Sequence, residues 1–184
     1  MNTQPESADA RGSDALLALA ERLDSITSVI GRVVSYLGVA TVLITFVTVY
    51  LRYAFDLGYI WLQESYVWTH TAMIMLGAGY AMLRDGFVRV DLFYRHWSER
   101  SRAWVDLLGT LLFLGSFLAL LAYYGWPFVA VSYAMQENSQ YEGGLPGLWL
   151  LKGMLLAFVG LLGMHGLAIV LRSLSVLRTS AQGS

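Results

Sequence analysis

The stretch LLGTLLFLGSFLALLAYYGWPFVAVSYAMQ, residues 107–136, contains no Asp, Glu, Lys or Arg. As a helix it would measure about 45 Å, so it must tilt within the ~30 Å hydrocarbon core of a bilayer or emerge from it. Three more windows without these charges cover residues 33–51, 65–83 and 153–171. Each can cross a bilayer as a helix, and none alternates as a membrane strand does. The sequence therefore predicts an all-α integral membrane protein with four transmembrane helices.

The composition agrees with this class of protein. Hydrophobic residues make up 57% of the chain and charged residues 14%, which is far from the balance of a soluble domain. The absence of cysteine excludes disulfides and thiolate metal sites. The net charge of −1, without a glycine-rich phosphate loop or a nucleic-acid module, predicts no nucleic-acid partner.

Basic residues predict the orientation of the chain. Residues 1–32, the loop 84–106 and the tail from Arg172 together hold ten of them, whereas the other two connections hold only Arg52 and Lys152. By the positive-inside rule, both termini and the 84–106 loop face the cytoplasm, an N-in/C-in topology.

The segments outside the four windows differ in polarity. Residues 1–13 are expected to be a disordered cytoplasmic tail, 14–172 a single membrane domain and 173–184 a second cytoplasmic tail. Helical spacing predicts an amphipathic lead-in to the first window at Leu16, Leu19, Leu23, Ile26 and Ile30. A segment lying in the membrane interface is predicted between the second and third windows from Val90, Phe93, Tyr94 and Trp97. Ser98, just before Glu99, predicts the cap of the next helix.

The stretch MLRDGFVRVD, residues 82–91, carries four charges where the second helix leaves the bilayer. A basic loop that fixes topology is the favoured interpretation over a transport or catalytic site. Mixed signs within one short stretch also suit specific pairing with a partner better than attraction to anionic lipid. The four candidates for this contact are Arg84, Asp85, Arg89 and Asp91.

Three ionisable residues are candidates for chemistry. His70 and His165 lie within windows, but counted from the outer edge their depths differ by about 10 Å, which argues against a shared haem. Glu64 lies at the outer mouth of the second window, where a carboxylate that hydrogen-bonds a helix end or a neighbour is favoured over ion coupling. We predict no catalytic, metal or cofactor site.

Glycines mark a turn and two packing faces. In the connection 137–152, Gly143 and Gly144 permit positive φ and Pro146 can start the last helix. Small residues at helical spacing predict close-packing faces, within the chain or with a partner. One face contains Gly153, Ala157 and Gly160, and the other contains His70, Gly77 and Arg84.

The order of several motifs resembles the small membrane subunit, DctQ-like, of tripartite ATP-independent periplasmic (TRAP) transporters, over roughly residues 30–172. The matching pieces are WLQES (61–65), LGAGYAMLRDG (76–86), VRVDLFY (88–94), RAWVDLLGTLLFL (102–114) and GGLP (143–146). Two positions depart from the family pattern. Gln63 stands where members often have a second acid, and Phe87 where they often have a histidine.

The resemblance implies a multi-pass subunit of a bacterial inner-membrane complex. In such systems a periplasmic solute-binding protein delivers an organic acid to a large permease subunit driven by a sodium gradient. The small subunit is expected to act as a scaffold, or stator, among lipid and these two partners, without enzyme activity, cofactor or small-molecule substrate of its own. The candidate partner or structural residues are Trp61, Glu64, Gly77, Arg84, Asp85, Gly86, Arg89, Asp91, Gly143, Gly144 and Pro146.

Two other function classes stay open at this point. A four-helix membrane redox subunit of the cytochrome b type is the main alternative, because two histidines lie within windows. A self-sufficient small exporter is less favoured, because no acid lies in the middle of a window.

Overall fold

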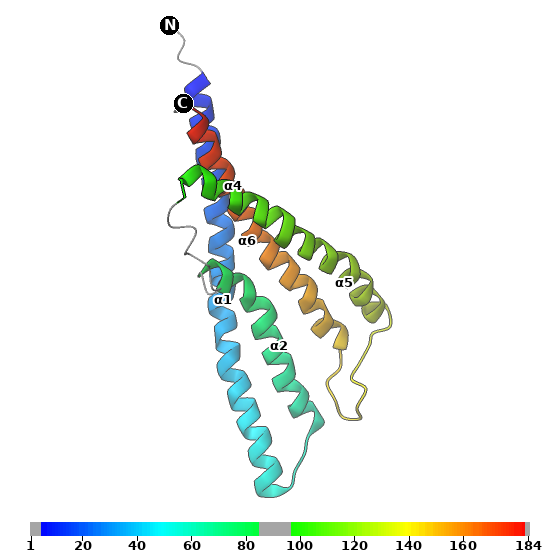
Figure 1. Ribbon diagram of the computed structural model, residues 1–184. Helices are drawn as coiled ribbons and strands as arrows, with labels where there is room; N and C mark the ends of the chain where they lie inside the picture. Colours follow the sequence, from blue (N-terminus) through cyan, green and yellow to red (C-terminus); the bar gives the residue numbers. More distant parts are fainter. Residues whose placement is uncertain (1–4, 85–96, 183–184) are drawn as a thin grey trace.

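The computed structural model describes residues 5–84 and 97–182, and within these ranges all regular structure is helical. The elements in chain order are α1 (Pro5–Phe55), α2 (Ile60–Leu83), α4 (Glu99–Gly109), the π-helical η1 (Thr110–Gly115), α5 (Ser116–Ala134) and α6 (Leu148–Gln182). Figure 1 shows both termini and the start of α4 at one end of the array, here called the termini end. The connections 56–59 and 135–147 lie toward the opposite end, here called the connection end.

Three helical stretches are long and apolar enough to cross a membrane: Ala15–Phe55, Glu99–Ala134 and Leu148–Arg178. They contain the first, third and fourth predicted windows apart from Met135 and Gln136. The second window lies within α2, a helix of 24 residues that begins at Ile60, upstream of the predicted start. This helix also carries Gln63, Glu64 and His70, and it is not among the three apolar stretches found in the described residues. A fourth span therefore remains a proposal.

Helix α1 joins the predicted lead-in and the first window into one element of 51 residues. At 1.5 Å per residue it is about 76 Å long, more than twice the thickness of a hydrocarbon core. It begins at Pro5, inside the stretch 1–13 that the sequence predicts to be disordered. The lead-in is held by packing, because Leu16 and Leu23 lie against the buried cluster of Ala20, Ala168 and Leu171.

The cap predicted at Ser98 is confirmed. Its side-chain oxygen accepts a hydrogen bond from the backbone N–H of Ser101 at 3.3 Å, and Glu99 lies in the first turn of α4. The predicted interfacial segment falls largely on residues 85–96, which lie outside the described residues.

Helix α6 is central, since it packs against α1, α2, α4 and α5. Close approach depends on small residues at the crossings. A Cβ on Gly79 of α2 would lie 3.3 Å from the carbonyl oxygen of Leu161 in α6. Between α1 and α2, the Thr41 hydroxyl donates a hydrogen bond to that of Thr69 at 2.9 Å. Packing by small and hydroxyl-bearing residues is typical of helices that associate within membranes.

Candidate functional site

The inner face of α1 is built from small and polar residues. Ala20, Asp24, Thr27, Gly31 and Val34 recur at alternating steps of four and three, and all five are buried. A Cβ on Gly31 would lie 2.1 Å from Cγ of Tyr80 in α2, so the ring occupies the space that only glycine leaves free. This spacing keeps one side of a helix toward its neighbours, and the face therefore determines how α1 meets α2 and α6.

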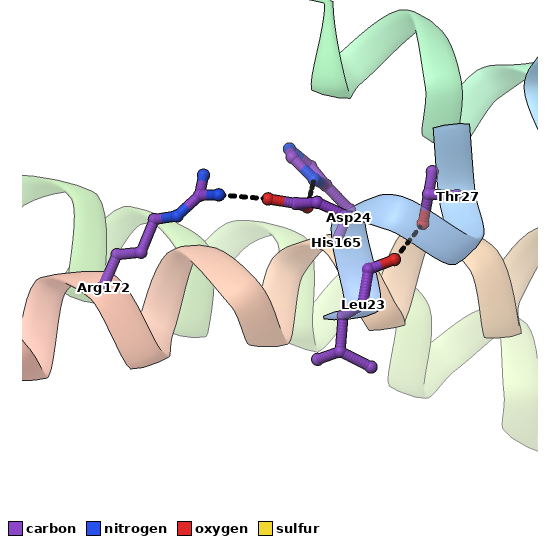
Figure 2. Close-up of polar contacts among 5 residues, drawn as sticks. All are labelled: Leu23, Asp24, Thr27, His165 and Arg172. Atoms are coloured by element: carbon purple, nitrogen blue, oxygen red, sulfur yellow. Dashed lines mark hydrogen bonds and ion pairs between the residues drawn. The ribbon is translucent and has the colours of Figure 1, made fainter. Parts of the chain in front are cut away.

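Asp24 joins this face to α6 through a polar cluster of buried Asp24 and His165 with the half-exposed Arg172, drawn in Figure 2. Oδ1 of Asp24 lies 3.0 Å from Nδ1 of His165, and Oδ2 accepts a hydrogen bond from the guanidinium of Arg172. Asp24 is 7% exposed and His165 only 4%. Thr27 does not compete for the carboxylate, because its hydroxyl donates to the Leu23 carbonyl at 3.0 Å. The Asp24 cluster thus links α1 to α6.

A second polar contact holds the connection 135–147 at the opposite end. Oε2 of Glu64, in the first turns of α2, accepts a hydrogen bond from the Leu145 N–H at 2.5 Å, and Oε1 accepts one from the Ser139 hydroxyl. A Cβ on Gly144 would lie 2.3 Å from Oγ of Ser139 and 2.8 Å from Oε2 of Glu64. Here glycine is required by close approach rather than by its φ angle. This Glu64 contact fixes the connection against the start of α2.

The same connection is also tied to α6. Glu137 accepts hydrogen bonds from Lys152 Nζ at 2.5 Å and from the Ser132 hydroxyl at 2.6 Å. The hydrogen bond from Lys152, followed by that from Ser132, holds the pKa of the Glu137 carboxyl below its ordinary value. The ammonium of Lys152 also lies 4.5 Å from the ring centroid of Phe128. The end of α5 is thereby joined to the first turns of α6.

The turn residues of the connection partly match the prediction. Gly143 has a positive φ of +77°, as predicted. The second glycine with a positive φ is Gly147, at +81°, rather than Gly144. Pro146 lies two residues before α6, which begins at Leu148, so it does not start the helix. It lines a hollow of about 400 Å³ together with Trp68, Gln136, Asn138, Gly147, Trp149 and Leu150.

The other candidate residues are spread along α2. Trp61 is half exposed beside Tyr59, whereas Gly77 faces Val34 of α1, with 3.7 Å between its Cβ position and Cγ1. Arg84 caps the far end of α2, where its Nε donates to the Tyr80 hydroxyl at 3.2 Å. The remaining candidates, Asp85, Gly86, Arg89 and Asp91, lie outside the described residues. The structure thus unites Glu64 with Gly144 and separates both from Arg84.

The two histidines of the predicted windows do not share a site. His165 is buried with one ring nitrogen facing Asp24, whereas His70 is exposed on α2. The predicted small-residue face of α6 is also open toward the described residues. Apart from the backbone of α6 itself, nothing in the described part of the chain lies within 4 Å of a Cβ built on Gly153 or Gly160.

Sequence reasoning missed Asp24, Arg172, Glu137 and Lys152 as functional residues. The sequence did contain a signal for Asp24, because this acid shares one helix face with Ala20, Thr27 and Gly31 at steps of four and three. A regular face of small residues is typical of close helix packing rather than of a solvated surface. The pairing of Glu137 with Lys152 depends on how the connection folds, and no spacing rule predicts it.

Long apolar helices, joined to one another by buried polar groups and by ties from their connections, define a multi-pass helical membrane protein. Residues 41–176 match the family model described as the DctQ component of tripartite ATP-independent periplasmic transporters, and the chain belongs to this family. It is a family of transporter components and not of enzymes. The matched region includes His165 and Arg172 and leaves Asp24 outside. No curated protein and no solved structure matches the chain.

Proposed function

We propose that this small permease component serves a sodium-coupled transporter of organic acids, as a stator for the large permease subunit. The observation that carries the proposal is that polar side chains in the described residues join helices to one another and to a connection. The Asp24 cluster joins α1 to α6, and the Glu64 contact joins α2 to the connection before α6. A subunit whose helices are joined at two separate places provides the rigid support against which a partner can move.

Docking of the periplasmic solute-binding protein is the second part of the proposal. The connection end presents exposed aromatic and acidic side chains, namely Trp61, Tyr141 and Glu142. Aromatic residues on a rigid base are common anchors of protein interfaces. The Glu64 contact would hold these groups in place for the binding protein.

At the other end, the charged stretch 84–91 is proposed to meet the large subunit on the cytoplasmic side. Arg84 supports this assignment, because it is exposed at the end of α2 and its guanidinium lies 5.4 Å from the centroid of the Tyr80 ring. A stacked arginine is pre-organised for pairing with a carboxylate.

A redox role is less well supported by the geometry. Haem ligation by two histidines needs both side chains at one depth and facing each other. His165 is held against Asp24 and His70 is exposed on a different helix, so the pair does not form such a site.

The proposed membrane is the bacterial inner membrane, with both termini in the cytoplasm and four spans. The excess of basic residues in residues 1–32, in 84–106 and in the tail from Arg172 supports this orientation. Because the chain has no native cysteine, single cysteines report topology directly. In intact cells an impermeant thiol reagent should label Glu142→Cys and leave Arg100→Cys unlabelled, and the opposite pattern would reverse the orientation.

The functional test is reconstitution of the large subunit in proteoliposomes with a binding protein, with and without this chain. Uptake of labelled dicarboxylates, keto acids and hydroxy acids is measured with and without an inward sodium gradient. We expect uptake only when all three components and the gradient are present. Full uptake without this chain would refute the stator role, and uptake independent of sodium would refute the coupling.

A further inference from the structure

Helix α1 carries a second row of residues, on a side that no helix within residues 5–84 and 97–182 covers. From Leu19 to Tyr50 the row follows alternating steps of three and four. Its large apolar members are between 43% and 76% exposed. They are Leu19, Ile26, Val29, Val33, Tyr36, Leu43, Val47 and Tyr50; Arg22 and Ala40 complete the row. We call these ten residues the outer row.

The outer row is distinct from the inner face of α1, which packs against α2 and α6. The inner face contains Ala20, Thr27, Val34 and Thr48, which are all buried, whereas their neighbours in the outer row are exposed. The predicted lead-in divides between the two faces. Leu16 and Leu23 pack against the core, and Leu19 and Ile26 point away from it.

Lipid alone does not account for the outer row. Its 32 positions extend for about 47 Å along the helix axis, at 1.5 Å per residue. A core of ~30 Å covers about 39 Å of a helix even at a tilt of 40°, the upper end of the usual range. Part of this exposed apolar row therefore lies outside the hydrocarbon, in the polar headgroup layer or beyond it, where its Leu, Ile and Val side chains are no longer surrounded by apolar chains.

The spacing of the outer row indicates a helix as its cover. Apolar residues at steps of three and four form the seam of left-handed helix pairs, which cross at about 20°. Ile26, Val29, Val33 and Val47 are β-branched and lose little side-chain freedom when such a seam closes. A row of this length fits one long helix rather than a loop or a short segment.

We propose that a long helix of the large permease subunit packs along this row, an inference that rests on the proposed function. Arg22 argues against a second copy of this chain as the partner on this row. Two copies share one orientation in the membrane, so a symmetric pair along this row would place Arg22 against Arg22, and like charges in contact disfavour pairing. The partner helix is expected to offer an acidic side chain or free carbonyl groups opposite Arg22.

The proposal is tested by photocrosslinking in the membrane, with this chain and the large subunit expressed together. A benzophenone amino acid replaces Val29 or Val33 in the outer row. The matched control is Phe113, which is 78% exposed on η1. We expect adducts to the large subunit at positions 29 and 33 with at least tenfold higher yield than at position 113. Adducts mainly to a second copy, or no protein adduct from a complex that co-purifies, would overturn the proposal.

Co-purification of the unmodified chain with the large subunit separates the two levels of inference. If the subunits co-purify and the row gives no adducts, only the assignment of this face fails. If they do not co-purify, the proposed function fails together with it. A charge test complements the crosslink: Arg22→Glu should lower co-purification at least tenfold, whereas Arg100→Glu, an exposed arginine on α4, should leave it unchanged. Equal recovery of both variants would contradict the pairing expected at Arg22.

Discussion

Two polar ties of this molecule, the Asp24 cluster and the Glu64 contact, differ in what they join. The Asp24 cluster joins two helices by side chains alone, with Asp24 7% and His165 4% exposed. The Glu64 contact joins a helix to a connection, and one of the carboxylate oxygens accepts a hydrogen bond from a backbone N–H. The first therefore sets how α1 and α6 lie against each other, whereas the second sets the conformation of one connection.

The difference predicts which of the two contacts contributes more to the stability of the molecule. Removing a buried charged group leaves its partners without compensation in a region that excludes water. Removing a half-buried acceptor lets water replace it, at a lower cost. Loss of the Asp24 cluster should consequently affect the global stability of the helix array, and loss of the Glu64 contact should affect mainly the connection.

The largest expected effect is that of Asp24→Ala. We expect the free energy of unfolding to fall by about 2 to 4 kcal/mol, because His165 is left buried without its partner while the half-exposed Arg172 recovers solvent. Unfolding by SDS from mild detergent micelles measures this change. Glu21→Ala is the control, since Glu21 is an exposed acid one turn away. Equal stability of the two variants would show that the cluster contributes nothing.

The second effect concerns the glycine that brings α1 against α2. A Cβ on Gly31 would meet the Tyr80 ring at 2.1 Å, so Gly31→Ala forces the helices apart at a cost of about 1 to 3 kcal/mol. Gly160→Ala is the matched control, because no other element in the described residues comes within 4 Å of its added methyl group. In the same unfolding assay the control should be neutral or stabilised by about 0.5 to 1 kcal/mol, the usual gain of alanine over glycine in a helix. A loss of the same size in both variants would contradict close packing at Gly31.

Much of this architecture was predictable because it depends on local properties of the chain. The apolar windows at 33–51 and 153–171 lie inside long helices, and the Ser98 cap follows from the hydrogen-bonding capacity of one side chain. The positive φ of Gly143 likewise reflects the freedom of glycine within a turn.

The arrangement of faces was less predictable, because a helix with apolar residues on two sides does not reveal which side packs. The lead-in pattern grouped Leu19 with Leu23, although only Leu23 meets the core. Gly153 and Gly160 belong to a predicted small-residue face, yet close contacts between helices occur at other glycines, among them Gly31 and Gly79. Those contacts depend on Tyr80 and Leu161, which lie far along the sequence.

The contrast between the two ties can be sharpened at Glu64. Glu64→Gln keeps the shape of the side chain and removes the charge that strengthens its two hydrogen bonds. We expect local opening of the connection to become easier by about 1 to 2 kcal/mol, with hydrogen exchange at the Leu145 amide faster by roughly tenfold. Exchange in α1 and α6 should not change. Glu142→Gln, an exposed acid in the same connection, is the control, and equal exchange in both variants would remove the assigned role of Glu64.

The smallest effect is a pH dependence at Glu137. Since its hydrogen bonds to Lys152 and Ser132 hold the pKa of Glu137 below the ordinary value, the tie is fully formed above the unfolded pKa and is lost as the pH falls through the folded one. Between pH 7 and about 5.5 the connection should therefore be unchanged, and below about 4.5, near the ordinary pKa of a glutamate, it should loosen. Hydrogen exchange across residues 135–147, corrected for the intrinsic effect of pH on exchange, provides the measurement. The comparison is made with Glu137→Gln, which should lack the part of the pH dependence that belongs to Glu137. If the two proteins respond identically to acid, the tie to α6 is not controlled by the charge of Glu137.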